Sequence, residues 1–157
     1  MKFLFLFILF ISYDKSIPIL NQNVIEYVDT VIGKKVMRGE CWDLAAAALD
    51  HAGAYLDRRS QKSIYVFGKK LNPKSDEIFP GDIIQIENVK LKYIKDDGIY
   101  TETMTHHTAI IYKVLGTGQF KIAHQNTSFS GKKVGISDFN MEYIEKGRII
   151  FYRPYKK

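Results

Sequence analysis

Apolar side chains recur at helical spacing in two segments near the start of the chain. In the first segment Asn23 can cap a short helix and Gly33-Lys34-Lys35 ends it. The apolar face of this helix is formed by Val24, Tyr27, Val28 and Val31. We expect the helix to bury that face against the rest of the domain.

A second helix is predicted from about Cys41 to His51. Four consecutive alanines, residues 45–48, have high helix propensity, and Gly53 closes the helix. One face of this helix is lined by Cys41, Leu44, Ala45, Ala48 and Ala52. Because these side chains are small, another element can pack close to the helix. Gly39 allows a tight approach of the chain to its first turn.

Beyond Gly53 the pattern changes to short apolar runs that predict strands. The expected strands cover residues 63–67, 82–86, 107–115, 120–124 and 148–152. Pro80-Gly81 is a turn signal, and Gly116-Thr117-Gly118 predicts a hairpin. The polar residues 88–105 predict a long hairpin or loop that would overhang any site built on His107. Two N-terminal helices packed on an antiparallel β-sheet make an α+β fold.

The first residues have the pattern of a secretory signal peptide. Lys2 precedes nine consecutive apolar residues, 3–11, and a membrane span needs about 20. No Ala-x-Ala motif follows, so Ser12 or Ser16 would have to serve at the cleavage site. The alternative is a packed N-terminal strand. We therefore expect residues 1–16 to be a signal peptide, residues 17–157 to be one domain, and the protein to be secreted, periplasmic or extracellular without a stable membrane span.

The composition narrows the class of partner. In 157 residues, 46% hydrophobic and 25% charged content is ordinary for a globular protein with a core. The net charge of +6 favours anionic partners such as cell-wall polymers, membrane surfaces or nucleic acid. The basic residues form no run of five or more, which argues against a nucleic-acid-binding tail. The composition does not predict an oligomeric state.

The chain has one cysteine, Cys41, and its place at a helix start favours a reactive thiol. A free thiol has a pKa of about 8.5, and a helix N-terminus or a neighbouring imidazole lowers it. A lone cysteine in a secreted protein cannot form an internal disulfide, which also favours a free thiol. The simpler alternative is that Cys41 is a small core residue.

Two histidines are candidate partners for this thiol. His107 begins one predicted strand and His124 ends the next, so a hairpin would make them cross-strand neighbours. One imidazole would take the proton and the other would hold its ring. The adjacent His106 points to the opposite face, and Ala109 shares the face of His107, so we expect His107 to face Cys41. His51 is too far along the helix and is expected at the surface.

A metal site is a competing use of one cysteine and nearby histidines. The chain contains no Cys-x-x-Cys, His-x-His or His-Glu-x-x-His motif. We therefore predict neither a metal nor another cofactor.

Four short pieces, taken in order, resemble one superfamily. They are Gly39-Glu40-Cys41-Trp42, Pro80-Gly81-Asp82-Ile83-Ile84, His107-Thr108-Ala109-Ile110-Ile111 and Ile122-Ala123-His124-Gln125-Asn126. This order is similar to that of the papain-like cell-wall hydrolases, which include the CHAP and NlpC-type peptidases. The resemblance implies a papain-like (NlpC/CHAP) fold for residues 17–157.

The resemblance also implies roles for individual residues. Cys41 matches the family nucleophile, His107 the base and His124 the third polar residue. Asn126 matches an asparagine that follows the third residue in CHAP members. Glu40 stands where CHAP members often have glutamine, and Trp42 follows the nucleophile as a supporting residue.

The implied function is hydrolysis of amide bonds in peptidoglycan, by a peptidase or an N-acetylmuramoyl-L-alanine amidase. Peptidoglycan or another anionic cell-wall polymer would then be the partner. Two alternatives remain. One is a non-catalytic secreted binding module of the same fold. The other is an acyl hydrolase or transferase acting on lipids or small amides.

Overall fold

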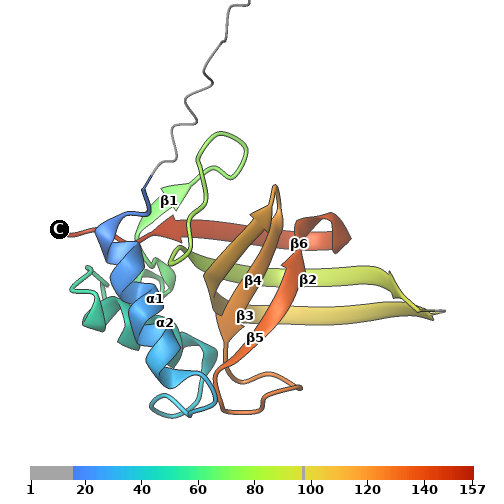
Figure 1. Cartoon of the computed structure of the whole chain (residues 1–157), viewed down its shortest axis with the longest axis horizontal. Coiled ribbons are helices and arrows are strands. Elements are labelled where there is room, and N and C mark those ends of the chain that lie inside the picture. Colours follow the sequence, from blue (N-terminus) through green and yellow to red (C-terminus); the bar gives the residue numbers. More distant parts are fainter. Residues whose placement is uncertain (1–15, 97) are drawn as a thin grey trace, which may run out of the picture.

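Two helices lie against one face of a six-stranded antiparallel sheet (Figure 1). The computed structural model describes residues 16–96 and 98–157. The apolar run of the predicted signal peptide lies outside these residues. Within them, no helix is long and apolar enough to cross a membrane. The fold is the predicted α+β class, with the helices first and the sheet after them.

The elements follow one another in a simple order. The helices are α1 (Ile19–Val31) and α2 (Cys41–His51), and two 3₁₀ turns are η1 (Ser63–Tyr65) and η2 (Met141–Tyr143). The strands are β1 (Lys69–Leu71), β2 (Ile83–Lys95), β3 (Gly98–Gly116), β4 (Gln119–His124), β5 (Gly135–Asn140) and β6 (Ile144–Arg153). Their order in the sheet is β1-β6-β2-β3-β4-β5, so β1 and β5 form its edges.

The sheet separates two apolar layers because successive side chains of a strand point to opposite faces. On the helix side, Leu44 and Ala48 of α2 pack in one cluster with Ile83, Ile110 and Ala123 of the sheet. The opposite face has its own cluster, which includes Ile84, Ala109, Ile111, Phe120 and Phe151. The core face predicted for α2 is confirmed, since its apolar members are buried and Cys41 is half-buried at its edge.

Strands β2 and β3 continue past the crossing strands β4 and β5 as a long arm, along which β6 stays paired with β2 as far as Leu91 (Figure 1). Strand β3 pairs with β2 from Gly98 onwards, but it pairs with β4 only from Ile110 to Gly116. Among the described residues, the part of β3 before Ile110 therefore has one edge without a partner strand. The predicted hairpin over residues 88–105 is confirmed, and its residues are mostly paired strand rather than loop.

Several predicted boundaries are wrong for local reasons. Residues 63–67 do not form a strand, because the hydroxyl and backbone N–H groups of Ser60 and Ser63 bond to each other and tighten the chain into η1. Helix α1 begins at Ile19, directly after Pro18, whose carbonyl accepts the N–H of Gln22. Asn23 therefore lies inside the helix and does not cap it. Strands β1 and β5 were not predicted.

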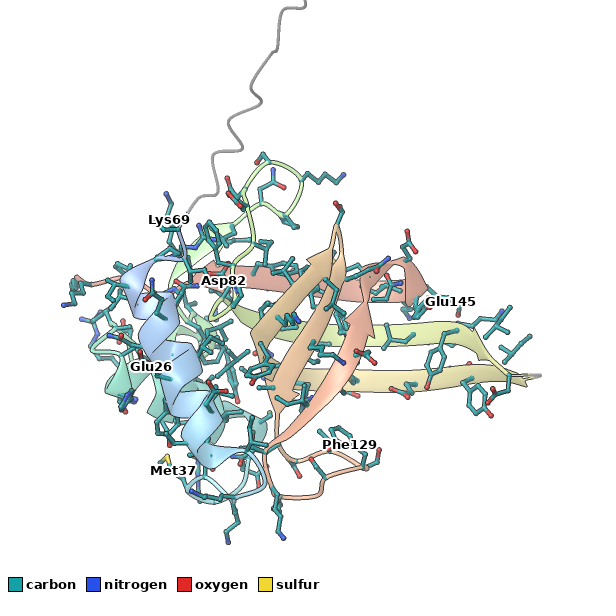
Figure 2. The ribbon with its side chains drawn as sticks, in the orientation of Figure 1. Glu26, Met37, Lys69, Asp82, Phe129 and Glu145 are labelled. Carbon is teal, nitrogen blue, oxygen red and sulfur yellow. The ribbon has the colours of Figure 1, made fainter. Side chains whose placement is uncertain are left out.

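The Pro80-Gly81-Asp82 turn anchors the start of β2 to distant elements. The Asp82 carboxylate is fully buried and accepts bonds from the Phe79 backbone N–H, the Asn21 amide and the Arg153 guanidinium. Gly81 has a φ of 86°, and a Cβ there would lie 2.4 Å from the Asn21 carbonyl oxygen. The turn thus joins α1, β2 and the end of β6, where Figure 2 labels Asp82.

Candidate active site

Cys41 is the first residue of α2, and a buried carboxylate fixes the chain that leads to it. Asp43 accepts bonds from the backbone N–H groups of Arg38 and Glu40 and from the Arg38 guanidinium. Burial raises the pKa of Asp43, but these bonds outweigh burial and leave the pKa below its usual value. Gly39, at a φ of 86°, makes the sharp approach that the sequence predicted. The thiol therefore stands at the positive end of the helix dipole.

The thiol opens on a hollow of about 650 Å³, here named the Cys41 hollow. The residues that line it include Arg38, Cys41, Tyr65, His106 and Asn126. Trp42 also lines it and donates its indole N–H to the Ile64 carbonyl at 2.7 Å. A half-buried thiol in a hollow of this size is accessible to a small acyl group.

The expectation that His107 faces Cys41 is wrong. His106 lines the Cys41 hollow, whereas strand alternation puts His107 on the opposite face of the sheet, with Ala109 and Ile111. The His106 ring packs edge-on against Tyr65 at 4.4 Å, and the Gln85 amide lies 3.2 Å from its Nδ1. Gln85 is itself held by the Thr108 hydroxyl, which donates to Oε1 at 2.7 Å. The physical reason is strand alternation, because residues 106, 108 and 110 share the face that the helices cover.

His107 and His124 are brought together as predicted. A hydrogen bond of 2.9 Å joins His107 Nε2 and His124 Nδ1. Ser137 extends the chain, with its hydroxyl 2.8 Å from His124 Nε2. The three side chains lie at a second hollow of about 610 Å³, here named the histidine hollow. Ala109 and Ile111 share the face of His107, as expected, but they pack in the apolar layer opposite the helices.

Both buried histidines are held neutral near pH 7. Burial lowers the pKa of His107 to about 4, and the charge of His106 adds to the effect. Burial, together with His107, lowers the pKa of His124 to about 3. A neutral imidazole has one unprotonated ring nitrogen, so either ring can accept a proton or a hydrogen bond.

The two hollows adjoin, because His106 and Asn126 line both of them. No hydrogen bond reaches the Cys41 sulfur from any residue in the part of the chain that the structure describes. In unliganded enzymes such bonds are often long and shorten when substrate binds. The roles of Cys41, His107 and His124 therefore stay predictions.

Residues that follow β4 bind Glu40, which directly precedes Cys41 in the sequence. Asn126 donates to the Glu40 carboxylate at 2.8 Å, and Lys132 forms an ion pair with the same carboxylate. Gln125 donates to the Glu40 backbone carbonyl at 2.8 Å. Glu40 and Asn126 thus act together, as supports of the helix start. Across residues 16–96 and 98–157, no group of three His, Cys, Asp or Glu side chains could hold a metal ion.

Sequence reasoning did not find three polar residues of the site. His106 was expected to face away from Cys41, and Gln85 and Ser137 were not predicted to belong to the site. The Ser137 strand, β5, has no clear alternation of apolar and polar residues that would have revealed it. Gln85 stands inside an otherwise apolar strand, and a lone polar residue at such a position is a usable signal.

Two helices on a six-stranded antiparallel sheet, with a cysteine opening the second helix, define a papain-like cysteine proteinase fold. The chain belongs to the family described as the AIM3/BBC1 cysteine proteinase-fold domain, whose model matches residues 19–157. The family match therefore covers nearly all described residues, and it does not single out the CHAP or NlpC-type families.

One curated relative is the "Altered inheritance of mitochondria protein 3" of Debaryomyces hansenii. It is 27% identical to this chain over an alignment 157 positions long, which covers 87% of this chain and 16% of the yeast protein. The chain thus spans about a sixth of that protein's length.

Two solved structures share the fold. They are the crystal structure of Ly7917 and that of Ly7917 with the hydrolyzing product of MDP. Both are 18% identical to this chain, with TM-scores of 0.51 and 0.53. They cover 84% and 85% of this chain and 62% of the Ly7917 chain. This likeness concerns the fold.

Proposed function

We propose that the protein is a cysteine hydrolase that cleaves amide bonds, with Cys41 as nucleophile and His107 as base. The observation that carries the proposal is the hydrogen-bonded pair His107–His124 in a hollow that adjoins the Cys41 hollow. A base oriented by a third group and paired with a thiol is the usual arrangement for nucleophilic catalysis. The approach of Cys41 to His107 is part of this proposal, because His107 does not line the Cys41 hollow. The family's fold supports the same class of chemistry.

The ring bonds are compatible with a proton arrangement in which His107 acts as a base. If His124 Nε2–H donates to the Ser137 hydroxyl, His124 Nδ1 is free to accept the Nε2–H of His107. His107 Nδ1 then carries the lone pair that takes the thiol proton. In this arrangement Ser137 and His124 hold His107 in its basic tautomer.

The proposed reaction has two halves. The Cys41 thiol gives its proton to His107 as the sulfur attacks the amide carbonyl carbon. The C–N bond then breaks, and the His107 imidazolium protonates the leaving amine. Water next gives a proton to His107 as its oxygen attacks the thioester, which releases the acid and restores the thiol. The oxyanion would be bound by the backbone N–H of Cys41 at the helix N-terminus.

The low pKa of His107 sets the resting state. With a pKa of about 4, His107 is neutral near pH 7. In the proposed enzyme its imidazole is therefore free to take the thiol proton during the attack. Such general-base catalysis typically contributes 10²–10⁴-fold.

The first test is the rate of Cys41 alkylation by iodoacetamide against pH. The assay suits this chain because it contains one thiol. We expect wild-type alkylation below about pH 8 to exceed that of the His107→Ala variant by at least tenfold. His51→Ala, at an exposed histidine late in α2, is the matched control and should alkylate like wild type.

His106 is a second candidate base, because it lies in the Cys41 hollow itself. The same assay on His106→Ala separates the two histidines. A large loss of alkylation rate in His106→Ala with none in His107→Ala would show that His106, and not His107, is the base. Equal rates in all variants would contradict any activated thiol and favour a non-catalytic binding module.

For the substrate we propose a peptide amide, and the peptidoglycan peptide implied by the sequence resemblance is the first compound class to test. MDP itself is a suitable compound, because one of the Ly7917 structures is described as holding the hydrolyzing product of MDP. We expect release of a free amine or acid by wild type and none by Cys41→Ala. Lipid or small-ester turnover without amide cleavage would instead favour the acyl hydrolase or transferase.

Secretion stays a prediction, and it rests on the signal-peptide pattern of residues 1–16. Expression of the chain with and without these residues, followed by fractionation of cells and medium, tests it. Shorter mature protein in the medium only when the segment is present would support the signal peptide.

A further inference from the structure

The Cys41 hollow is the first of three neighbouring hollows. His106 and Asn126 line both the Cys41 hollow and the histidine hollow. Glu102 and Asp138 in turn line both the histidine hollow and a third hollow of about 500 Å³. The third hollow, here named the aromatic hollow, is walled by Leu91, Tyr93, Leu115, Phe120, Phe139 and Tyr143. The three hollows are therefore neighbours in series, and together they are here named the trough.

The walls of the trough are strand edges. On one side, Glu102, Thr103 and Met104 of β3 line the histidine hollow. On the other, Ser137 and Asp138 of β5 line it. Consecutive residues of a strand point to opposite faces, so a run of them can share one hollow only along the edge of the strand.

Both edges are without a partner strand in the described residues. Strand β3 pairs with β4 only from Ile110 onwards, and β5 pairs only with β4 and ends the sheet. Unpaired backbone N–H and C=O groups at such edges form a template for another extended chain. A folded ligand or a sugar ring would not match the repeat of these groups.

We propose that the trough binds an extended polypeptide by strand addition and presents one of its peptide bonds to Cys41. The peptide backbone pairs with the free edge of β3 or β5, and an apolar side chain distant from the scissile bond occupies the aromatic hollow. This proposal rests on the proposed function for the cleavage, but the binding stands on the trough alone. Main-chain bonds supply affinity and the aromatic hollow supplies selectivity, as in other cases of strand addition.

Binding is tested with a displayed library of random 12-residue peptides and the Cys41→Ser variant of the full chain, which cannot form a thioester. We expect enriched peptides that share an apolar residue. In fluorescence anisotropy, Tyr143→Ala should weaken the best peptide about tenfold. Tyr155→Ala is the matched control, an exposed tyrosine that packs on Tyr55 outside the three hollows, and should leave affinity within about twofold.

Strand addition is tested by methylating each backbone nitrogen of the selected peptide in turn. Affinity should fall at alternate positions and hold at the positions between them. No enriched peptide, equal effects of Tyr143→Ala and Tyr155→Ala, or indifference to methylation would overturn the proposal.

The wild-type enzyme then separates this proposal from the proposed function. Cleavage of the selected peptide by wild type supports both. Peptide binding without cleavage, together with an unactivated Cys41 in the alkylation assay, would support peptide binding in the trough and contradict the proposed hydrolase activity. An activated Cys41 with no peptide binding would support the hydrolase activity and contradict peptide binding in the trough.

Discussion

At the scale of single residues, Ser137 is the last member of the hydrogen-bonded series His107–His124–Ser137. Its hydroxyl lies 2.8 Å from His124 Nε2, and His124 Nδ1 lies 2.9 Å from His107. The ring of Phe129, labelled in Figure 2 on the loop between β4 and β5, lies 5.4 Å from His124. A ring held on two sides in this way keeps one orientation, which a base needs in order to act on a fixed thiol.

Replacing Ser137 tests whether it positions the pair. In Ser137→Ala the hydroxyl that holds the His124 ring is lost, so we expect Cys41 alkylation at pH 7 to fall about three- to tenfold. Ser137→Thr keeps the hydroxyl and suits a strand, so it should restore the rate. In Ser137→Asp the carboxylate should stabilise the imidazolium and shift the alkylation profile to lower pH. Three variants with the wild-type profile would show that Ser137 is only a surface contact.

At the scale of elements, the buried Asp82 links helix α1 to strands β2 and β6. It accepts bonds from Asn21 and from Arg153, and its side chain is fully buried. Removing one partner of a buried ion pair leaves the other charged and unpaired. The turn therefore depends on all three groups at once.

Asp82→Ala is expected to lower the free energy of unfolding by about 3–5 kcal/mol, measured by urea denaturation. Asp138→Ala is the matched control, because its ion pair with Lys121 lies at the surface, with Asp138 78% exposed. The control should cost under about 1 kcal/mol. Similar losses in both variants would show that Asp82 is not an anchor.

Element by element, the sequence predicted best where the signals are local. Helix α2 runs from Cys41 to His51 as predicted, because the alanine run and Gly53 act within the helix itself. The hairpin between β3 and β4 was also predicted from its glycines. Strand β5 was missed because it is an edge strand, paired with β4 alone, and its sequence carries no period of two.

At the scale of the whole molecule, the two buried histidines make stability depend on pH. Their folded pKa values of about 4 and about 3 lie below the ordinary 6.5. Between pH 6.5 and these values the unfolded chain binds more protons than the folded one, so acid favours unfolding. The stabilisation that comes from keeping the two histidines neutral is complete above about pH 6.5 and is lost as the pH falls toward their folded pKa values.

We expect roughly 2 kcal/mol of stability to be lost for each of the two histidines between pH 7 and pH 5. Urea denaturation at both values measures the loss. His124→Gln should have a smaller loss than wild type, whereas His51→Ala, at an exposed histidine, should lose as much as wild type. A wild-type protein equally stable at pH 7 and pH 5 would contradict the burial of the pair.

The sequence by itself determined the elements and the residues that local chemistry marks. It placed Cys41 at the start of a helix and predicted that His107 and His124 would meet, because helix propensity and hairpin turns act over short stretches of chain. Only the tertiary structure decided which hollow each histidine lines and that Ser137 and Gln85 complete the two histidine contacts. These contacts join residues far apart in the sequence. They depend on which sheet face the helices cover and on how β4 and β5 cross the arm, and both features arise from packing the two apolar layers together.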